Sequence, residues 1–189
     1  MDPDGPSTVA LTIDAPAWPT QLADPEGVCR HALAATLERV PTPPWLARAE
    51  IGVVLADDAT VRRLNADHRG NDRATNVLSF PTFERILEDE PRHLPPGPVP
   101  LGDVVLALET VHAEASVEGK PFLDHVSHLL VHGCLHLLGY DHETAADQAR
   151  MEGLERAILA QLGIPDPYAD AAERPVSGAA NRPVLETEL

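Results

Sequence analysis

The sequence predicts an α+β fold: a small mixed four-stranded sheet packed with about five helices. Short apolar, β-branched segments of strand length fill much of the first 110 residues, and segments with helical spacing dominate after them. The two kinds of segment do not alternate as a regular βαβ repeat, which favours α+β over α/β. A length of 189 residues, 43% of them hydrophobic, is sufficient for one domain with its own core.

Four segments have the composition of strands. Residues 51–55 are apolar and β-branched, and residues 76–80 form a similar segment that ends at Pro81. The acidic, proline-rich segment 84–100 is predicted to be a loop. The predicted strands are residues 8–14, 51–55, 76–80 and 101–108.

Helix signals are clearest in the second half of the chain. Pro121 suits a first helical turn, and Gly139 suits the left-handed residue that follows a helix. Asp24 and Pro25 mark an earlier helix start, which Pro41 closes. The predicted helices are residues 25–40, 58–65, 110–117, 121–138 and 143–162.

The predicted domain ends near the last helix. Residues 1–168 are expected to form a single domain. Residues 169–189 are rich in Ala, Pro and Glu and have no apolar periodicity, so we expect a disordered C-terminal tail.

Composition narrows the class of protein. The chain has only two cysteines, Cys29 and Cys134, which we interpret as free core thiols in a reducing compartment. No segment approaches the roughly 18 consecutive apolar residues of a membrane span, and the N-terminus lacks a signal-peptide pattern. We therefore expect a soluble, cytoplasmic protein that needs no membrane partner.

The net charge of −16 argues against a broad nucleic-acid-binding surface. The charge is unevenly distributed, however: residues 59–75 contain four arginines and two acidic residues. A small basic site for a phosphate is therefore compatible with the composition.

The histidine motif HGCLHLLGYDH contains the candidate metal ligands of the sequence. His132 and His136 are four residues apart on a predicted helix, so that both rings project from one side and can hold one ion. Gly139 then turns the chain, which allows His142 to become a third ligand. Three protein ligands leave one position for water, the pattern of catalytic zinc sites, and one zinc ion per chain is predicted. His125 and His128 are interpreted either as residues that support the ligands or as part of a substrate groove.

The spacing of the motif is similar to that of the metzincin zinc proteases, in which a glutamate follows the first ligand and acts as general base. Here that position is Gly133. The ligand spacing is retained but the protease's base is absent, which favours another metal-assisted hydrolysis.

The same motif resembles the signature of the YbeY family of bacterial endoribonucleases. Three other blocks resemble the family in the same order: LNADHRGNDRATNVLSFP, LGDVVLAL and MEGLERAILAQLGIPDPY. The resemblance covers roughly residues 50–168, and four ordered blocks make it specific.

The resemblance implies a zincin-like α+β fold and a single-strand-specific endoribonuclease that acts in 16S rRNA 3′-end maturation and ribosome quality control. Residues 1–168 are then expected to be a single metal-dependent ribonuclease domain. It assigns the metal to His132, His136 and His142, and a functional role to Arg69 in the Arg-Gly-x-Asp stretch. The expected partners are single-stranded RNA, including 16S rRNA, and the ribosome or its proteins, whereas DNA is not expected.

From the residues themselves, Asp141 is a second catalytic candidate, because it stands beside the ligand His142 and can act as a base or orient that ligand. Two alternatives remain open at this stage. One is a metallohydrolase of a different class, a peptidase or small-molecule hydrolase. The other is a non-catalytic ribosome-assembly factor whose metal is a structural staple.

Overall fold

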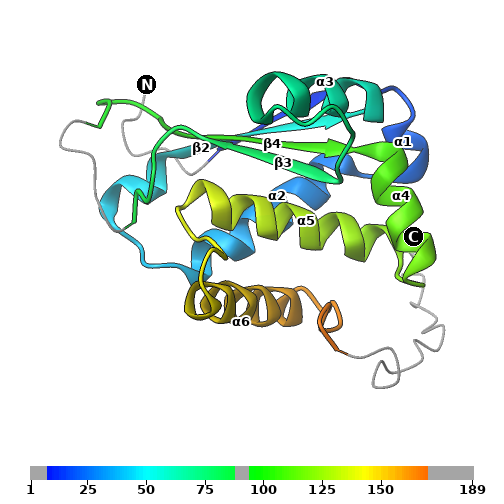
Figure 1. Cartoon of the computed structure of the whole chain (residues 1–189). Helices are drawn as coiled ribbons and strands as arrows, with labels where there is room; N and C mark the ends of the chain where they lie inside the picture. The colour runs from blue at the N-terminus through cyan, green and yellow to red at the C-terminus, as the bar shows by residue number, and fades with distance from the viewer. Residues whose placement is uncertain (1–7, 88–93, 170–189) are drawn as a thin grey trace, which may run out of the picture.

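The computed structural model describes residues 8–87 and 94–169. Its centre is a four-stranded sheet with the order β1-β2-β4-β3, in which β1, β2 and β4 are parallel and β3 is antiparallel to β4 (Figure 1). The predicted α+β fold with a mixed four-stranded sheet is confirmed. The strands are β1 (Thr8–Ile13), β2 (Ala49–Ala56), β3 (Val77–Pro81) and β4 (Val99–Ala107).

Helices cover both faces of this sheet. In Figure 1, α3 lies over one face, α5 and α2 lie over the other, and α6 packs on the far side of α5. The helices are α1 (Trp18–Gln21), α2 (Pro25–Arg39), α3 (Asp58–Arg69), α4 (Leu108–Val117), α5 (Phe122–Leu137) and α6 (Ala145–Gln161), with a 3₁₀ helix η1 (Pro44–Arg48).

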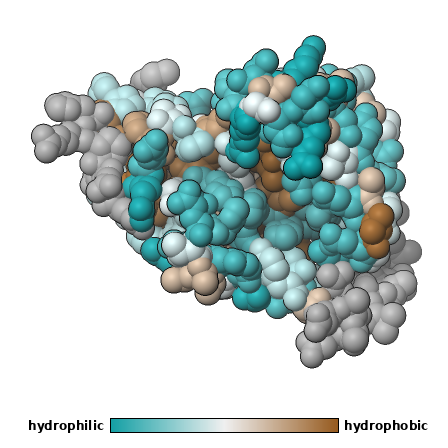
Figure 2. Space-filling model, viewed as in Figure 1, coloured by the Kyte–Doolittle hydropathy of each residue, from teal (hydrophilic) through white to brown (hydrophobic). Residues whose placement is uncertain are grey.

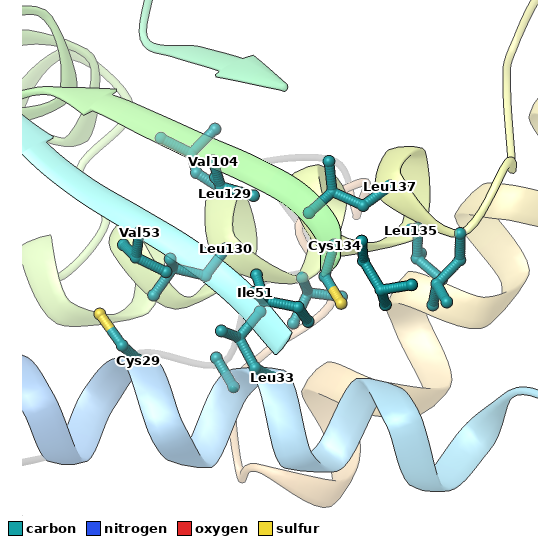
Figure 3. Packing of buried hydrophobic residues seen from close by; sticks show 14 of the residues in the cluster. Cys29, Leu33, Ile51, Val53, Val104, Leu129, Leu130, Cys134, Leu135 and Leu137 are labelled. Carbon is teal, nitrogen blue, oxygen red and sulfur yellow. The ribbon is translucent and has the colours of Figure 1, made fainter. Parts of the chain in front are cut away.

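The main core lies between the sheet, α2 and α5. Alternate β2 residues Ile51 and Val53 point into it and meet Leu33 of α2 and Leu130 of α5 (Figure 3). Alternation sends Ala56 to the opposite face, where a smaller cluster packs under α3. The face shown in Figure 2 is mostly hydrophilic, with its apolar residues set back from the surface. Apolar clusters thus lie on both faces of the sheet, and the larger one fixes α5 at the centre of the molecule.

Both cysteines are fully buried, and both are free thiols. Burial raises the pKa of the Cys29 and Cys134 thiols to about 12. Neither is a thiolate near neutral pH, so the interpretation as core thiols is confirmed.

Some predicted boundaries were wrong, and two short helices were missed. Helix α3 continues to Arg69 instead of ending at residue 65. Strand β4 begins at Val99, inside the segment predicted to be a loop, because it pairs with β2 from Ala49 onward. The short helices α1 and η1 were not predicted. The rest of the predicted acidic loop falls partly on residues 88–93, which lie outside the described residues. The same is true of the predicted tail, 169–189, except for its first residue.

Within the described part of the chain, no helix has both the length and the apolar character needed to span a bilayer.

Candidate metal centre

The first two candidate ligands lie on the C-terminal half of α5. His132 and His136 are one helical turn apart, and their ring centroids are 4.6 Å apart. Their neighbours Gly133, Cys134 and Leu135 are fully buried, whereas both histidines are only partly buried. The apolar side of α5 therefore anchors the helix and leaves the two imidazoles at the edge of the core.

Gly139 brings the third histidine back to the helix. It has φ +90°, and a Cβ atom at this position would lie 2.4 Å from the Cα atom of Arg85. The amide of Tyr140 donates to the carbonyl of Leu135, which closes the end of the helix. Only glycine fits this turn, and the turn places His142 within 5.1 Å of the His136 ring, measured between centroids.

One nitrogen from each of His132, His136 and His142 lies within 4.8 Å of the other two. The predicted histidines therefore converge. The Nε2 atoms of His132 and His136 are 3.1 Å apart, close to the ~3.3 Å expected for two imidazoles on one tetrahedral zinc ion.

The hydrogen bonds of the two Nδ1 atoms explain why the Nε2 atoms of His132 and His136 suit a cation. His132 Nδ1 lies 2.7 Å from Glu155 Oε1, and His136 Nδ1 lies 3.0 Å from the carbonyl oxygen of Tyr140. Both of these partners accept hydrogen bonds, so both Nδ1 atoms act as donors and the neutral rings keep their lone pairs on Nε2. Two lone pairs that face each other at 3.1 Å repel unless a proton or a metal ion lies between them. The donor set thus fits a metal ion.

Charge at the centre also favours metal binding. Burial, followed by the neighbouring His132 and His142, lowers the pKa of His136 to about 4. His136 is therefore neutral at pH 7, the protonation state that a metal ligand requires.

Glu155 was not identified from the sequence. Its side chain on α6 is fully buried, and its oxygens accept from His132 and from the Tyr168 hydroxyl. Burial raises the pKa of Glu155, but His128, His132 and Tyr168 around the carboxylate outweigh burial and lower it to about 2. One signal was available in the sequence: Glu155 falls between Met151 and Ile158 at helical spacing, on an otherwise apolar stripe.

The three histidines open into a cavity of about 720 Å³. Three arginines and four acidic residues contribute to its wall, a far more balanced charge than the −16 of the whole chain. The lining residues are Arg69, Asn76, Val77, Ser79, Pro81, Phe83, Glu84, Arg85, His132, His136, Gly139, Tyr140, Asp141, His142, Glu143, Asp147 and Arg150.

Arg69 shares this cavity, as the last residue of α3. Gly70, with φ +67°, ends that helix in a left-handed conformation. One guanidinium nitrogen of Arg69 donates to the carbonyl oxygen of Ser79 on β3, at 3.3 Å. The contact directs Arg69 toward the middle of β3 and leaves further N–H groups of its planar fork available in the cavity that Arg69 lines.

Asp141 lies at the exposed rim of the cavity, where its Oδ1 accepts from the backbone amide of His142 at 2.7 Å. Gly133 lies on another side of α5. A Cβ atom there would be 2.7 Å from Val104 Cγ1 and 3.2 Å from Ser79 Oγ. Close packing of α5 on β4 thus explains the glycine, and a glutamate at this position would have to displace the Val104 side chain.

The remaining charged candidates have local partners. Arg62 forms a bidentate pair with Asp72 at 2.7 and 2.8 Å. His125 lies 2.9 Å from Glu114, whereas His128 lies 3.5 Å from Glu155. His128, and not His125, therefore lies beside the carboxylate of Glu155, which also contacts the candidate ligand His132.

The fold and the site together define an α+β protein with a cluster of three histidines that could hold a metal ion. Residues 20–163 match the family model described as Endoribonuclease YbeY. The chain therefore belongs to the endoribonuclease YbeY family, and the resemblance seen in the sequence is confirmed.

Individual relatives agree with this assignment. The Endoribonuclease YbeY of Paramagnetospirillum magneticum is 50% identical over 163 residues, covering 86% of this chain and 96% of the relative. That of Bradyrhizobium sp. is 49% identical and covers 86% and 93%. The solution structure of the Thermotoga maritima protein TM1509 covers 88% of this chain and all of its own, with a TM-score of 0.51 and 19% identity. This last likeness supports the fold alone.

Proposed function

We propose that this protein is a zinc-dependent endoribonuclease that cleaves single-stranded RNA. The observation that carries the proposal is the convergence of His132, His136 and His142 in one cavity with Arg69, in a chain of the endoribonuclease YbeY family. Zinc is the proposed metal, because a ligand set of three imidazoles, joined by no carboxylate among the described residues, suits zinc better than magnesium or calcium.

Hydrogen bonds to the Nδ1 atoms of two candidate ligands orient their rings for metal binding. Glu155 and the Tyr140 carbonyl oxygen hold His132 and His136 with their Nε2 atoms toward a common point. When bound there, a zinc ion supplies Lewis acidity and an activated water.

Arg69 is the proposed phosphate-binding residue. Its guanidinium can donate two parallel hydrogen bonds to the non-bridging oxygens of a phosphodiester, and its positive charge would stabilise the negative charge that accumulates there in the transition state. Asp141 is the proposed proton acceptor, because its carboxylate lies at the rim of the same cavity beside the His142 ligand.

The proposed biological role is the one that the resemblance to the family implies. We propose that the substrate is the 3′ end of 16S rRNA during its maturation and ribosome quality control, in the cytoplasm, with the ribosome or its proteins as partners. The net charge of −16 suits contact with basic ribosomal proteins, while the cavity accommodates the RNA backbone.

The test uses one preparation of protein on four substrates: single-stranded RNA, double-stranded RNA, single-stranded DNA and casein. We expect cleavage of single-stranded RNA alone, lost with a chelator and in His136→Ala. Arg62→Ala, whose side chain pairs with Asp72, serves as the matched control and should retain activity. Proteolysis of casein that His136→Ala abolishes, with RNA left intact, would overturn the proposal in favour of a peptidase.

A further inference from the structure

Glu155 is, among the described residues, the one carboxylate that is fully buried. Removing a carboxylate from water costs several kcal/mol unless its oxygens are paired. Glu155 lies in the middle of α6, on the side that packs against α5. Its burial therefore needs an explanation in the contacts that it makes.

Both oxygens of Glu155 are used. Oε1 accepts from His132 Nδ1 at 2.7 Å, and Oε2 accepts from the hydroxyl of Tyr168. His128 Nε2 approaches Oε2 from α5, at 3.5 Å. The carboxylate thus connects a candidate metal ligand on α5 with a tyrosine that follows α6.

Tyr168 is itself held over α6 by several contacts. The guanidinium of Arg156 lies 4.9 Å from the centre of the Tyr168 ring, and Arg156 Nε is 3.3 Å from a carboxylate oxygen of Asp166. The Tyr168 amide donates to the other Asp166 oxygen at 2.9 Å. Residues 166–168 therefore form a clasp, which we name the Tyr168 clasp, that closes over the outer side of Glu155.

We propose that Glu155, held by the Tyr168 clasp, is the positioning residue for the metal ligand His132. An isolated imidazole exchanges between two tautomers and rotates about its side-chain bonds. A carboxylate on Nδ1 selects the tautomer with a bare Nε2, fixes the plane of the ring and makes Nε2 a stronger electron donor. His136 receives only a neutral carbonyl at the same position, so His132 becomes the more strongly prepared ligand.

This inference rests on the metal site of the proposed function, and its test measures zinc binding and ring tautomer instead of RNA cleavage. Zinc affinity is measured by competition with a coloured chelator, and the His132 tautomer by ¹⁵N NMR of the metal-free protein. Glu155→Ala should weaken zinc binding about 10- to 100-fold and leave His132 as a mixture of tautomers.

Two conservative variants separate positioning from folding. Glu155→Gln keeps an oxygen that accepts from Nδ1, so it should preserve the tautomer and recover part of the affinity. Tyr168→Phe removes the clasp's hydroxyl and should weaken zinc binding less than Glu155→Ala. Glu114→Gln is the matched control: Glu114 also pairs with a histidine of α5, His125, but touches no ligand, and its zinc affinity should equal that of the wild type.

The outcomes are distinguishable. Wild-type zinc affinity and a single tautomer in Glu155→Ala would overturn the inference while leaving the metal site intact. If Glu155→Ala does not fold, wild-type affinity in both Glu155→Gln and Tyr168→Phe would overturn it instead. A wild-type chain that binds no zinc would contradict the proposed function, and this inference with it.

Discussion

At the scale of single residues, substitutions of Arg69 best distinguish a role in binding RNA from a role in binding metal. Its side chain shares the cavity with the histidines but contacts Ser79 and no ligand. Arg69→Ala should therefore keep its zinc and its fold, yet cleave RNA at least 10-fold more slowly. Arg69→Lys should recover only part of the rate, since lysine lacks the bidentate fork. Single-turnover cleavage with parallel zinc analysis checks both variants, and an unchanged rate in Arg69→Ala would refute the role.

The lowered pKa of His136 predicts a pH dependence for the metal-free protein. In the unfolded chain this histidine takes up a proton near pH 6.5, but in the folded protein only near pH 4. Between these values the unfolded state binds more protons, so the free energy of unfolding should fall as the pH is lowered from about 6.5 to about 4.

The comparison with His136→Gln isolates this contribution. Chemical unfolding at several pH values, with chelator present, should show a shallower pH dependence in the variant because glutamine does not titrate. Identical slopes in the two proteins would contradict the assigned pKa.

The residues that sequence analysis could identify are those with local patterns. His132 and His136 follow from helical spacing, and His142 from the glycine that precedes it. The role of Glu155 depends on the packing of α6 against α5. This packing brings Glu155 to His132, which is 23 residues away in the chain, and no local pattern describes such a contact. Its place on an apolar stripe was a usable signal, because an acid there requires a buried partner.

At the scale of elements, the turn after α5 determines whether the third ligand reaches the other two. Gly139→Ala would force a side chain into a left-handed backbone and against the Arg85 backbone, 2.4 Å away. We expect a loss of roughly 2 kcal/mol or more in the free energy of unfolding, together with weaker zinc binding as His142 moves.

Gly153→Ala is the control for this variant. Gly153 lies inside α6, and apart from the adjacent residues and backbone of its own helix nothing lies within 4 Å of the added Cβ, so alanine should stabilise the protein by about 0.5–1 kcal/mol. Equal stability of the two variants in denaturant titrations would show that the Gly139 turn is not constrained.

Element boundaries were predicted well where turn residues mark them and poorly where tertiary contacts do. Gly139 marks the end of α5 in both sequence and structure. The short helix α1, by contrast, is held by Trp18, whose indole nitrogen donates to the Ala56 carbonyl across 38 residues. Similarly, β4 starts at Val99 because β2 supplies a partner there. Local propensity does not take account of such contacts, so it could not predict these features.

At the scale of the whole molecule, the Tyr168 clasp predicts where the functional chain ends. Removing residues 172–189 should leave the melting temperature and RNA cleavage nearly unchanged, because that segment has no apolar periodicity with which to pack. Ending the chain at residue 166 removes Tyr168 and should weaken zinc binding. A large drop in melting temperature in the longer truncated chain would show that the last residues pack on the domain.

The central claim is that one ion, held by His132, His136 and His142, makes this protein a ribonuclease. The most direct measurement is a titration of zinc into chelator-treated protein, with cleavage of a single-stranded RNA followed at each addition. Activity should rise linearly and level off at about one zinc per chain, whereas the His132→Ala, His136→Ala double variant should neither retain zinc nor cleave. Full cleavage by the metal-free wild type, or a full zinc complement in the double variant, would contradict the account.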